Sequence, residues 1–330
     1  MNVVVFLRLA LLSCSLWLSA VTVCAAQQLD FQRSEDDSSI QLAYRWKDFQ
    51  NQEQSLSFTL DKQQINRQFQ KLKTYQPLVA QQHIMLAMQR AARAVDPKQA
   101  RISVRILGQS LQYQVRARNP AIIDEWQTRL LSLEDQAFDD YLASNYYARY
   151  HDYLGQEGVK PDHLRYANES IETLLPAANA IYAKLLDNSQ PRAYVNILLS
   201  WLQSIPYDNL ENRLTSNGSG FLPPADVLIS NHGDCDSKTT LAVALLRSML
   251  PNMSMVILYL PGHALLGVQL SHREKDATVN IEGIDYLLVE PTGPAAYSVG
   301  EAAPTSLSAI AGNMFTYEKV GSLAQLTSSE

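Results

Sequence analysis

The sequence predicts an α+β protein, and two observations support that prediction. In the first half of the chain, segments that alternate apolar and polar residues occur in pairs, as the two strands of a hairpin do. Each pair is followed by a longer segment with the apolar spacing of an amphipathic helix, and this order of hairpin, helix, hairpin, helix is typical of a small α+β domain. In the second half, a helical segment is followed by three apolar segments with the length of strands.

The first 26 residues have the features of a secretory signal peptide. Residues 3–26 carry a single charge, Arg8, inside a long apolar run, and small residues then lead to Gln27. Cleavage is expected after Ala25 or Ala26, which predicts an exported protein with the periplasm as its compartment. A retained N-terminal membrane anchor stays open as the alternative, because the apolar run is long and lacks the usual cluster of positive charges before it.

The charge of the chain argues against a polyanionic partner. The full sequence has 27 basic and 33 acidic residues, and loss of the segment that holds Arg8 leaves 26 basic residues and a net charge of −7. Binding to nucleic acid or to an anionic membrane surface is therefore not expected. About 300 mature residues suffice for one large domain or two modest ones.

The expected N-terminal α+β domain covers residues 27–154. Residues 27–38 are polar and acidic and are expected to form a loose leader. Alternation over 40–46 and 55–60 predicts a β-hairpin with one buried face. The apolar spacing of residues 77–95 predicts an amphipathic helix, which a following proline stops.

A second hairpin and a long helix complete this domain. The strands are expected over 100–107 and 110–117, with Gly108 at the first central position of a type II′ turn. A helix that begins at Pro120 is expected to run to about residue 150. It ends among tyrosines for which packing between two domains is favoured over a carbohydrate-binding surface. These tyrosines are Tyr141, Tyr146, Tyr147, Tyr150 and Tyr153.

A linker that contains glycine and proline is expected over 155–168, followed by a second domain, residues 169–330. Two amphipathic helices are predicted over 170–187 and 191–205, and a loop rich in glycine, serine and asparagine follows them. The chain from Thr292 onward is rich in alanine, serine, glycine and proline, and it is expected to wrap the surface.

The second domain is organised around Cys235. This residue stands where a glycine-bearing loop turns into a helix whose apolar residues recur at helical spacing as far as Met249. Cys14 and Cys24 lie in the expected signal peptide, so the mature chain keeps Cys235 alone, without a disulfide partner. A helix N-terminus favours the thiolate, which is the nucleophilic form of cysteine. The alternative is a small buried apolar residue.

Three strands are predicted after this helix, over 253–260, 263–270 and 285–290. His263 begins the second strand, where its side chain can face the helix N-terminus and act as a base for the thiol. Glu290 ends the third strand, and a carboxylate at the end of an apolar strand needs a partner, which His263 supplies. Asp285, at the other end of that strand, is the alternative acid.

Two more acidic residues, Asp234 and Asp236, flank Cys235. They lack the further His, Cys or carboxylate spacing that a metal site needs. Helix capping and a pair with Lys238 are favoured for them. No metal and no cofactor are therefore expected.

Four short stretches within residues 191–294 resemble the bacterial transglutaminase-like, papain-like cysteine peptidase superfamily. They are Ser-Ile-Pro-Tyr at 204–207, Gly-Asp-Cys-Asp-Ser-Lys at 233–238, Pro-Gly-His-Ala at 261–264 and Leu-Val-Glu-Pro-Thr-Gly at 288–293. The resemblance implies a Gly-Asp-Cys loop that opens a helix packed on an antiparallel sheet, with the His at the start of one strand and the acid at the end of the next. The chain differs in two places, because Glu290 stands where Asp is commoner and Leu265 replaces an aromatic residue.

The resemblance also implies a triad of Cys235, His263 and Glu290 that acts on an amide or acyl carbon of a peptide or protein. The acyl-enzyme on Cys235 would pass its acyl group to water in a peptidase or amidase, which is favoured, or to an amine in a transglutaminase. Tyr207 is the candidate for helping the Cys235 backbone N–H to stabilise an oxyanion. The alternative from another class is a catalytically silent module that binds cell-envelope material.

Overall fold

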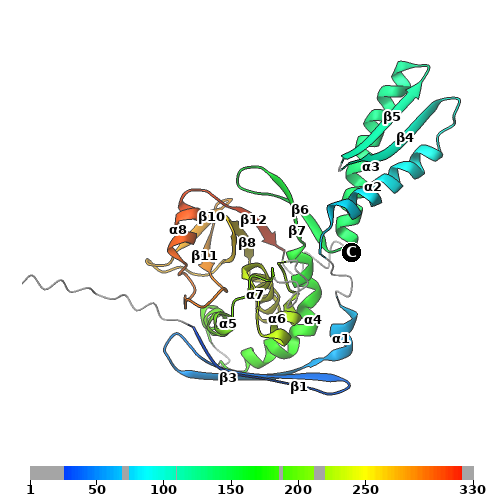
Figure 1. The fold of residues 1–330 in the computed structure, drawn as a ribbon. Coiled ribbons are helices and arrows are strands. Elements are labelled where there is room, and N and C mark those ends of the chain that lie inside the picture. Colours follow the sequence, from blue (N-terminus) through cyan, green and yellow to red (C-terminus); the bar gives the residue numbers. More distant parts are fainter. Residues whose placement is uncertain (1–25, 69–73, 109, 186–188, 212–219, 322–330) are drawn as a thin grey trace, which may run out of the picture.

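The computed structural model describes residues 26–68, 74–108, 110–185, 189–211 and 220–321. Their helices and antiparallel sheets confirm the α+β prediction (Figure 1). The expected signal peptide lies outside the described residues except for Ala26. Within the part of the chain that the structure describes, no helix combines the length and the apolar character needed to cross a membrane.

A five-stranded antiparallel sheet forms one side of the body of the molecule, in the order β10-β11-β9-β8-β12. Its strands are β8 (Met255–Leu260), β9 (His263–Val268), β10 (Thr278–Ile281), β11 (Ile284–Val289) and β12 (Thr316–Val320). Helix α7 (Cys235–Met249) packs on one face, while α8 (Pro304–Ala311) covers the other. The expectation that the chain from Thr292 only wraps the surface is therefore wrong, because this segment supplies both α8 and an edge strand.

Helix α7 lies at the centre of the body, and its residues from Leu241 to Leu246 have no exposed surface. Three further helices surround it in Figure 1. They are α4 (His163–Tyr182), α5 (Pro191–Ser204) and α6 (Pro224–Ser230). Because α7 is enclosed on all sides by apolar side chains, its first turn is held in place by packing rather than by helix propensity.

A second, three-stranded antiparallel sheet closes the far side of these helices. It consists of β1 (Gln27–Glu35), β2 (Ser39–Lys47) and β3 (Glu53–Asp61), and the short helix α1 (Lys62–Arg67) follows it. The buried face of β2 meets α5, where the ring of Tyr44 lies 5.1 Å from that of Trp201. The Tyr44 hydroxyl also donates a hydrogen bond to the Leu228 carbonyl in α6. The sheet is therefore tied to the helical layer by both apolar and polar contacts.

Two expectations about the first 170 residues are corrected by this arrangement. Residues 27–38 do not form a loose leader, because β1 pairs along the whole length of β2 and hydrogen-bonds to the backbone groups on its edge. The expected domain of residues 27–154 is also divided, since residues 27–61 share one apolar core with the helices and the sheet around Cys235. A hairpin with one apolar face needs a layer to pack against, and α4 and α5 supply that layer.

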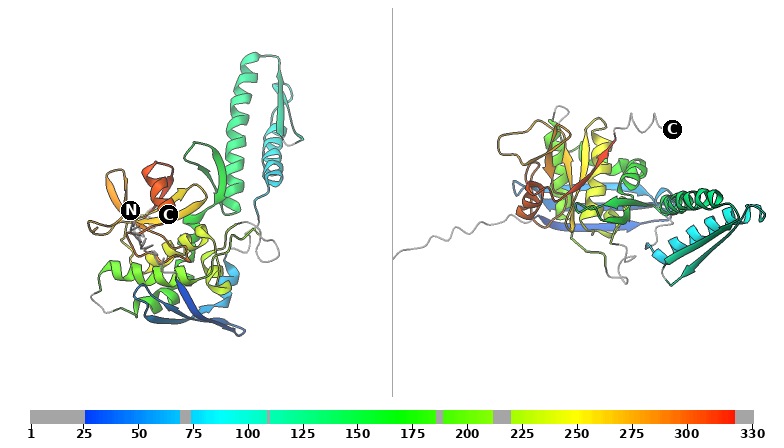
Figure 2. Two further views of the ribbon diagram at one scale, coloured as in Figure 1. Left: turned by 60° about the vertical axis from the view of Figure 1, so that its left-hand side comes forward. Right: turned by 90° about the horizontal axis from the view of Figure 1, so that it is seen from above.

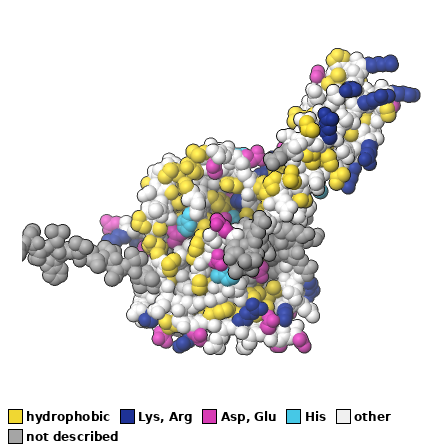
Figure 3. All heavy atoms as spheres, in the orientation of Figure 1, with side chains coloured by type: hydrophobic (Ala, Val, Ile, Leu, Met, Phe, Trp, Pro, Cys, Tyr) yellow, Lys and Arg dark blue, Asp and Glu magenta, His cyan; other side chains and the backbone are white. Residues whose placement is uncertain are grey.

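Residues 77–144 form a separate arm that extends away from the body in Figures 1 and 2. It contains α2 (Pro77–Arg93), β4 (Ala100–Leu107), β5 (Ser110–Ala117) and α3 (Pro120–Ser144), as predicted apart from the end of α3. Gly108 has a φ of 63°, which the hairpin turn requires. The arm has its own core, centred on Met88, Val104 and Leu130. Basic side chains gather along it in Figure 3, including Arg101 and Arg116, which face each other on the exposed side of the hairpin.

A two-stranded ribbon connects the arm to the body. The helix expected to reach residue 150 ends at Ser144, where Tyr146 adopts a left-handed φ of 61°, and β6 (Tyr147–His151) follows. Residues 155–168 are not a linker, since they hold β7 (Glu157–Pro161) and the first turn of α4. Tyr141 and Tyr147 pack against Tyr75 at this junction, which agrees with a packing role for part of the tyrosine cluster.

Candidate active site

Cys235 is the first residue of α7 and is half-buried. Asp234 caps the helix, because its carboxylate accepts a hydrogen bond of 2.9 Å from the Ser237 backbone N–H. Gly233 lies against Val227, so closely that a Cβ there would stand 3.3 Å from the valine methyl groups. These contacts fix the loop before Cys235, and they confirm the predicted capping role of Asp234.

Strand β9 meets the start of α7 at Ala264. The backbone N–H of Ala264 donates a hydrogen bond to the Cys235 sulfur, and this bond lowers the pKa of the thiol. The Ala264 carbonyl accepts a bond of 3.2 Å from the Thr239 hydroxyl one turn into the helix. Since Ala264 is held at both its polar groups, the start of β9, and with it the backbone of His263, is fixed against the N-terminus of α7.

The imidazole of His263 is oriented by Glu290. Its Nε2 hydrogen-bonds to Glu290 Oε1, while the Ser306 hydroxyl from α8 donates to Oε2 at 3.2 Å. Glu290 is only 2% exposed, so its carboxylate has exchanged water for these two partners. Because a carboxylate accepts the Nε2–H proton, Nδ1 keeps its lone pair and can serve as a base.

Of the two acids considered from the sequence, the structure brings Glu290 and not Asp285 to His263. Asp285 is exposed near the start of β11, where its carboxylate accepts a bond of 2.6 Å from the Asn280 side chain. The burial pattern along β11 explains this difference. The first residues of the strand face solvent, whereas its last residues, just before Glu290, lie in the core.

The ionisation of the thiol departs from the sequence-based expectation. Burial raises the pKa of Cys235, and the neighbouring Asp236 and Asp234 raise it further. Burial alone lowers the pKa of His263, but the hydrogen bond and charge of Glu290 outweigh it, so that this pKa is raised. The resting thiol donates to Asp236 Oδ1 at 3.5 Å. The resting site therefore favours a neutral thiol, and a thiolate forms only as its proton leaves for His263.

Tyr207 borders the loop that carries Cys235. It forms a parallel bridge with Gly233, and the Gly233 N–H donates to the Pro206 carbonyl at 3.3 Å. Its side chain is 51% exposed, and partial burial raises the pKa of its hydroxyl, with a further rise from the charge of a Cys235 thiolate. The hydroxyl therefore lies within electrostatic reach of the sulfur, at the open side of the site.

Gln203, which the sequence gave no reason to single out, positions the segment after Glu290. Its buried side-chain amide donates to the carbonyls of Glu290 and Tyr297, at 2.7 and 2.8 Å, and accepts from the Tyr297 N–H. Gly293 lies so close to this helix that a Cβ would stand 1.9 Å from the Gln203 carbonyl oxygen. The absence of a side chain at Gly293 thus allows α5 to hold the segment after Glu290 in place.

Gly293→Ala is expected to destabilise the protein by about 3 kcal/mol, since its methyl group overlaps backbone atoms that cannot turn away. The shift of the neighbouring segment should also lower turnover by moving Glu290. Chemical denaturation, followed by a kinetic assay under native conditions, measures both effects. Gly283→Asn is the matched control, because Gly283 has open space around its Cβ position and a φ of 84° that asparagine tolerates. Equal stability of the two variants would contradict the close approach at Gly293.

A second histidine, His163, lies behind Cys235 and was not expected there. It begins α4, is 1% exposed, and its Nε2 stands 3.7 Å from Asp236 Oδ2. Its Nδ1 bonds to the Tyr259 hydroxyl at 2.9 Å. No local pattern marks these partners, because they are separated by 73 or more residues of sequence and meet only through the packing of α4 on the sheet.

Lys238 does not form the expected ion pair with an acidic neighbour, although the charge of Asp234 acts on it. Burial lowers the pKa of Lys238 to about 7, and its ammonium group donates to the Ile205 carbonyl. Burial and Asp236 raise the pKa of Asp234, also to about 7. Across the described part of the chain, no group of three or more His, Cys, Asp or Glu side chains is arranged to hold a metal ion.

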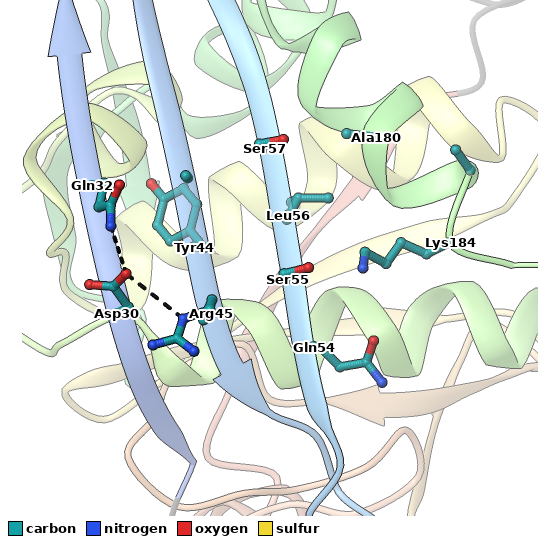
Figure 4. Close-up of a pocket in the computed structure, with 12 residues that line it drawn as sticks. Asp30, Gln32, Tyr44, Arg45, Gln54, Ser55, Leu56, Ser57, Ala180 and Lys184 are labelled. Carbon is teal, nitrogen blue, oxygen red and sulfur yellow. Dashed lines mark hydrogen bonds and ion pairs between the residues drawn. The ribbon is translucent and has the colours of Figure 1, made fainter.

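An open pocket of about 840 Å³ lies elsewhere, on the three-stranded sheet (Figure 4). Asp30 on β1 contacts Arg45 on β2 there, and Lys184 borders it from the end of α4. Two serines, Ser55 and Ser57, also line it, but there is no histidine among the lining residues to act as a base. The chemistry of the described residues is therefore concentrated at Cys235 and not at this pocket.

Comparisons of the chain with protein-family models, with curated proteins and with solved structures found no match. The family and the activity that we propose below are therefore argued from the residues of the site and their geometry.

Proposed function

We propose that this protein is an exported thiol enzyme of the transglutaminase-like superfamily that hydrolyses amide bonds in peptides or proteins. One observation carries the proposal. The half-buried sulfur of Cys235, at a helix N-terminus, is hydrogen-bonded to the backbone of Ala264, and the preceding residue, His263, has its Nε2 bonded to a buried glutamate. This combination of nucleophile, base and orienting acid is what thiol catalysis requires.

The order of the site along the chain supports the family. The nucleophile begins α7, the base begins β9 and the acid follows β11; β9 and β11 pair antiparallel, and α7 packs on their sheet. The sequence resemblance described above has the same order. Export, with the periplasm as the compartment, is proposed from the N-terminal apolar segment.

The reaction proceeds in two steps. Cys235 transfers its proton to His263 Nδ1, and the thiolate attacks the amide carbon to form a tetrahedral intermediate. The intermediate collapses when the imidazolium returns that proton to the leaving amine, and a thioester remains on Cys235. Water then attacks the thioester with His263 as the base, and the carboxylic acid and the free thiol are released.

Oxyanion stabilisation falls to groups at the open side of the site. The backbone N–H of Cys235 belongs to the first turn of α7, where it has no partner within the helix. The Tyr207 hydroxyl is the second donor in this proposal, since it borders the same loop and faces solvent. The two donors would bind the oxygen of the tetrahedral intermediate together.

Tyr207→Phe is expected to lower kcat by about 100-fold while KM changes little, because the lost hydrogen bond forms mainly in the transition state. The phenyl ring keeps the packing of the loop, so the melting temperature should stay the same. Steady-state kinetics with a peptide amide substrate measure the effect. Tyr317→Phe serves as the control, since Tyr317 is exposed on β12 and bonds to Glu282. A rise in KM alone would assign Tyr207 to substrate binding instead.

The experiment that tests the proposed function uses a peptidyl acyloxymethyl ketone, which alkylates activated cysteine thiols. The purified protein should be labelled at Cys235, and His263→Ala should prevent labelling at neutral pH. A peptide library, supplied with and without a primary amine, then separates hydrolysis from transfer to an amine. Failure to label, with the fold intact, would reject the enzyme and favour a silent binding module.

A further inference from the structure

A chain of buried polar groups leads from the edge of the five-stranded sheet to the back of Cys235. Lys160 on β7 donates to the Glu318 carboxylate at 2.9 Å, and the Tyr259 hydroxyl donates to the same oxygen at 2.7 Å. Tyr259 in turn bonds to His163 Nδ1. Side chains from β7, α4, β8 and β12 therefore meet in one network, which ends at an imidazole.

The direction of each hydrogen bond fixes the state of that imidazole. Glu318 accepts from an ammonium group and from a phenol, as an ionised carboxylate does. The single hydroxyl proton of Tyr259 is thereby used, so its oxygen can only accept from His163, which must carry a proton on Nδ1. Burial, aided by Lys160, lowers the pKa of His163 well below its usual value, so the ring is neutral and Nε2 bears a lone pair.

This lone pair has no hydrogen-bond partner among the described residues, and it points at a carboxyl group. His163 Nε2 is buried, and Asp236 Oδ2 stands 3.7 Å from it. The other oxygen of Asp236 accepts from the Cys235 thiol. An ionised Asp236 would therefore be repelled by the His163 lone pair at Oδ2 and by the developing Cys235 thiolate at Oδ1.

We propose that His163 and Asp236 are a second acid–base pair of the site, which holds one proton between Nε2 and Oδ2 and keeps negative charge away from the nucleophile. The proton resides on the carboxyl or on the imidazole, and in both forms the pair has no net charge. His163 is thus a positioning residue that acts on Cys235 through Asp236. This inference rests on the proposed role of Cys235 as nucleophile.

The charges around the pair agree with this assignment. Burial raises the pKa of Asp236, which favours a proton on its carboxyl, and Lys160, His263 and the thiol oppose that effect only in part. The charge of Asp236 also raises the pKa of His263, but less than the hydrogen bond and the charge of Glu290 do. Among the charges that raise the pKa of Cys235, in contrast, that of Asp236 has the largest effect. The other titratable groups on which the charge of Asp236 acts are Tyr207, Asp234 and Tyr259.

The test follows alkylation of Cys235 by iodoacetamide between pH 5 and pH 10, which needs no substrate. The modified peptide is quantified by mass spectrometry in the full chain, so Cys14 and Cys24 do not interfere. In His163→Phe, Asp236 loses the partner for its proton and ionises at neutral pH. The midpoint of alkylation should therefore rise by about one pH unit, with about tenfold slower alkylation at pH 7.

Three further variants separate this effect from packing. Asp236→Asn cannot ionise, so adding His163→Phe to it should leave the midpoint where Asp236→Asn alone puts it. His163→Gln offers an amide oxygen that can accept the carboxyl proton of Asp236, so it should keep the midpoint near that of the wild type, even if the phenylalanine variant folds poorly. Phe221→Leu is the packing control. The Phe221 ring lies 5.1 Å from the His163 ring and has no titratable group, so its loss changes the packing but not the charge.

An unchanged midpoint in both folded His163 variants would overturn the proposal, and so would a shift of equal size in the Asp236→Asn background. Failure of the proposed function has a different signature. In that case no amide substrate is turned over, while the alkylation midpoint still depends on His163 through Asp236.

Discussion

Cys235→Ala is expected to abolish turnover, lowering kcat by about 10⁵-fold or more, because it removes the sulfur that attacks the amide carbon in the proposed mechanism. The fold should survive, since the thiol is half-buried and its removal opens little space. The free energy of unfolding should therefore change by no more than about 1–2 kcal/mol. Kinetics and chemical denaturation of the same preparation measure the two quantities together.

Cys235→Ser distinguishes catalysis from structure in this experiment. A hydroxyl is close in size to a thiol but ionises far less readily, so this variant should be as inactive as the alanine variant and at least as stable. A variant with retained turnover would reject Cys235 as the nucleophile. Loss of turnover with a collapse of the melting temperature would instead indicate that the cysteine is a buried packing residue.

Glu290→Gln is expected to lower kcat by about 10³–10⁴-fold, although the side chain keeps its shape. The new amide can donate a proton to His263 Nε2, which drives the imidazole proton to Nδ1, where the base is needed. The carboxylate charge that raises the pKa of His263 is also lost. Protonation of the imidazole should then occur at lower pH, so the acidic limb of the kcat/KM profile should shift to lower pH as activity falls.

Asp285→Asn is the matched control for this experiment. It makes the same chemical change, but Asp285 lies near the start of β11, where its carboxylate bonds to Asn280 at the surface and does not reach His263. Both its activity and its pH profile should equal those of the wild type. If Asp285→Asn slowed turnover and Glu290→Gln did not, the identity of the third triad member would be reversed.

The site residues were recognisable in the sequence because each stands at the end of an element with a clear local pattern. The helix after Cys235 has an unbroken apolar spacing, and the strands that carry His263 and Glu290 are short apolar runs bounded by glycine or proline. Local patterns of this kind fix the direction of a chain and the point where it enters the core. They were sufficient to predict the bond between His263 and Glu290 and the approach of β9 to the start of α7.

Elements and contacts that depend on distant segments were not recognisable. β1 is polar along most of its length and becomes a strand because the edge of β2 needs hydrogen-bond partners. β12 likewise joins the sheet beside β8 with only one buried residue of its own, Val320. His163 and Gln203 reach the site from helices whose sequence shows only amphipathic spacing, so nothing local distinguishes them from other polar residues on those helices.

The contact between the first sheet and the central helices has a consequence for the order of folding. The Trp46 indole donates a hydrogen bond to the Ser200 hydroxyl, and these partners are 154 residues apart. The apolar face of β1–β3 can therefore be covered only after much of the chain has folded. Closing so long a loop loses conformational entropy before the stabilising contacts form, and this slows folding. The arm closes within residues 77–144 and can form early. We therefore expect the Cys235 thiol to be accessible to oxidants until the body assembles around α7. Oxidation of Cys235 should thus occur mainly before this last stage of folding is complete.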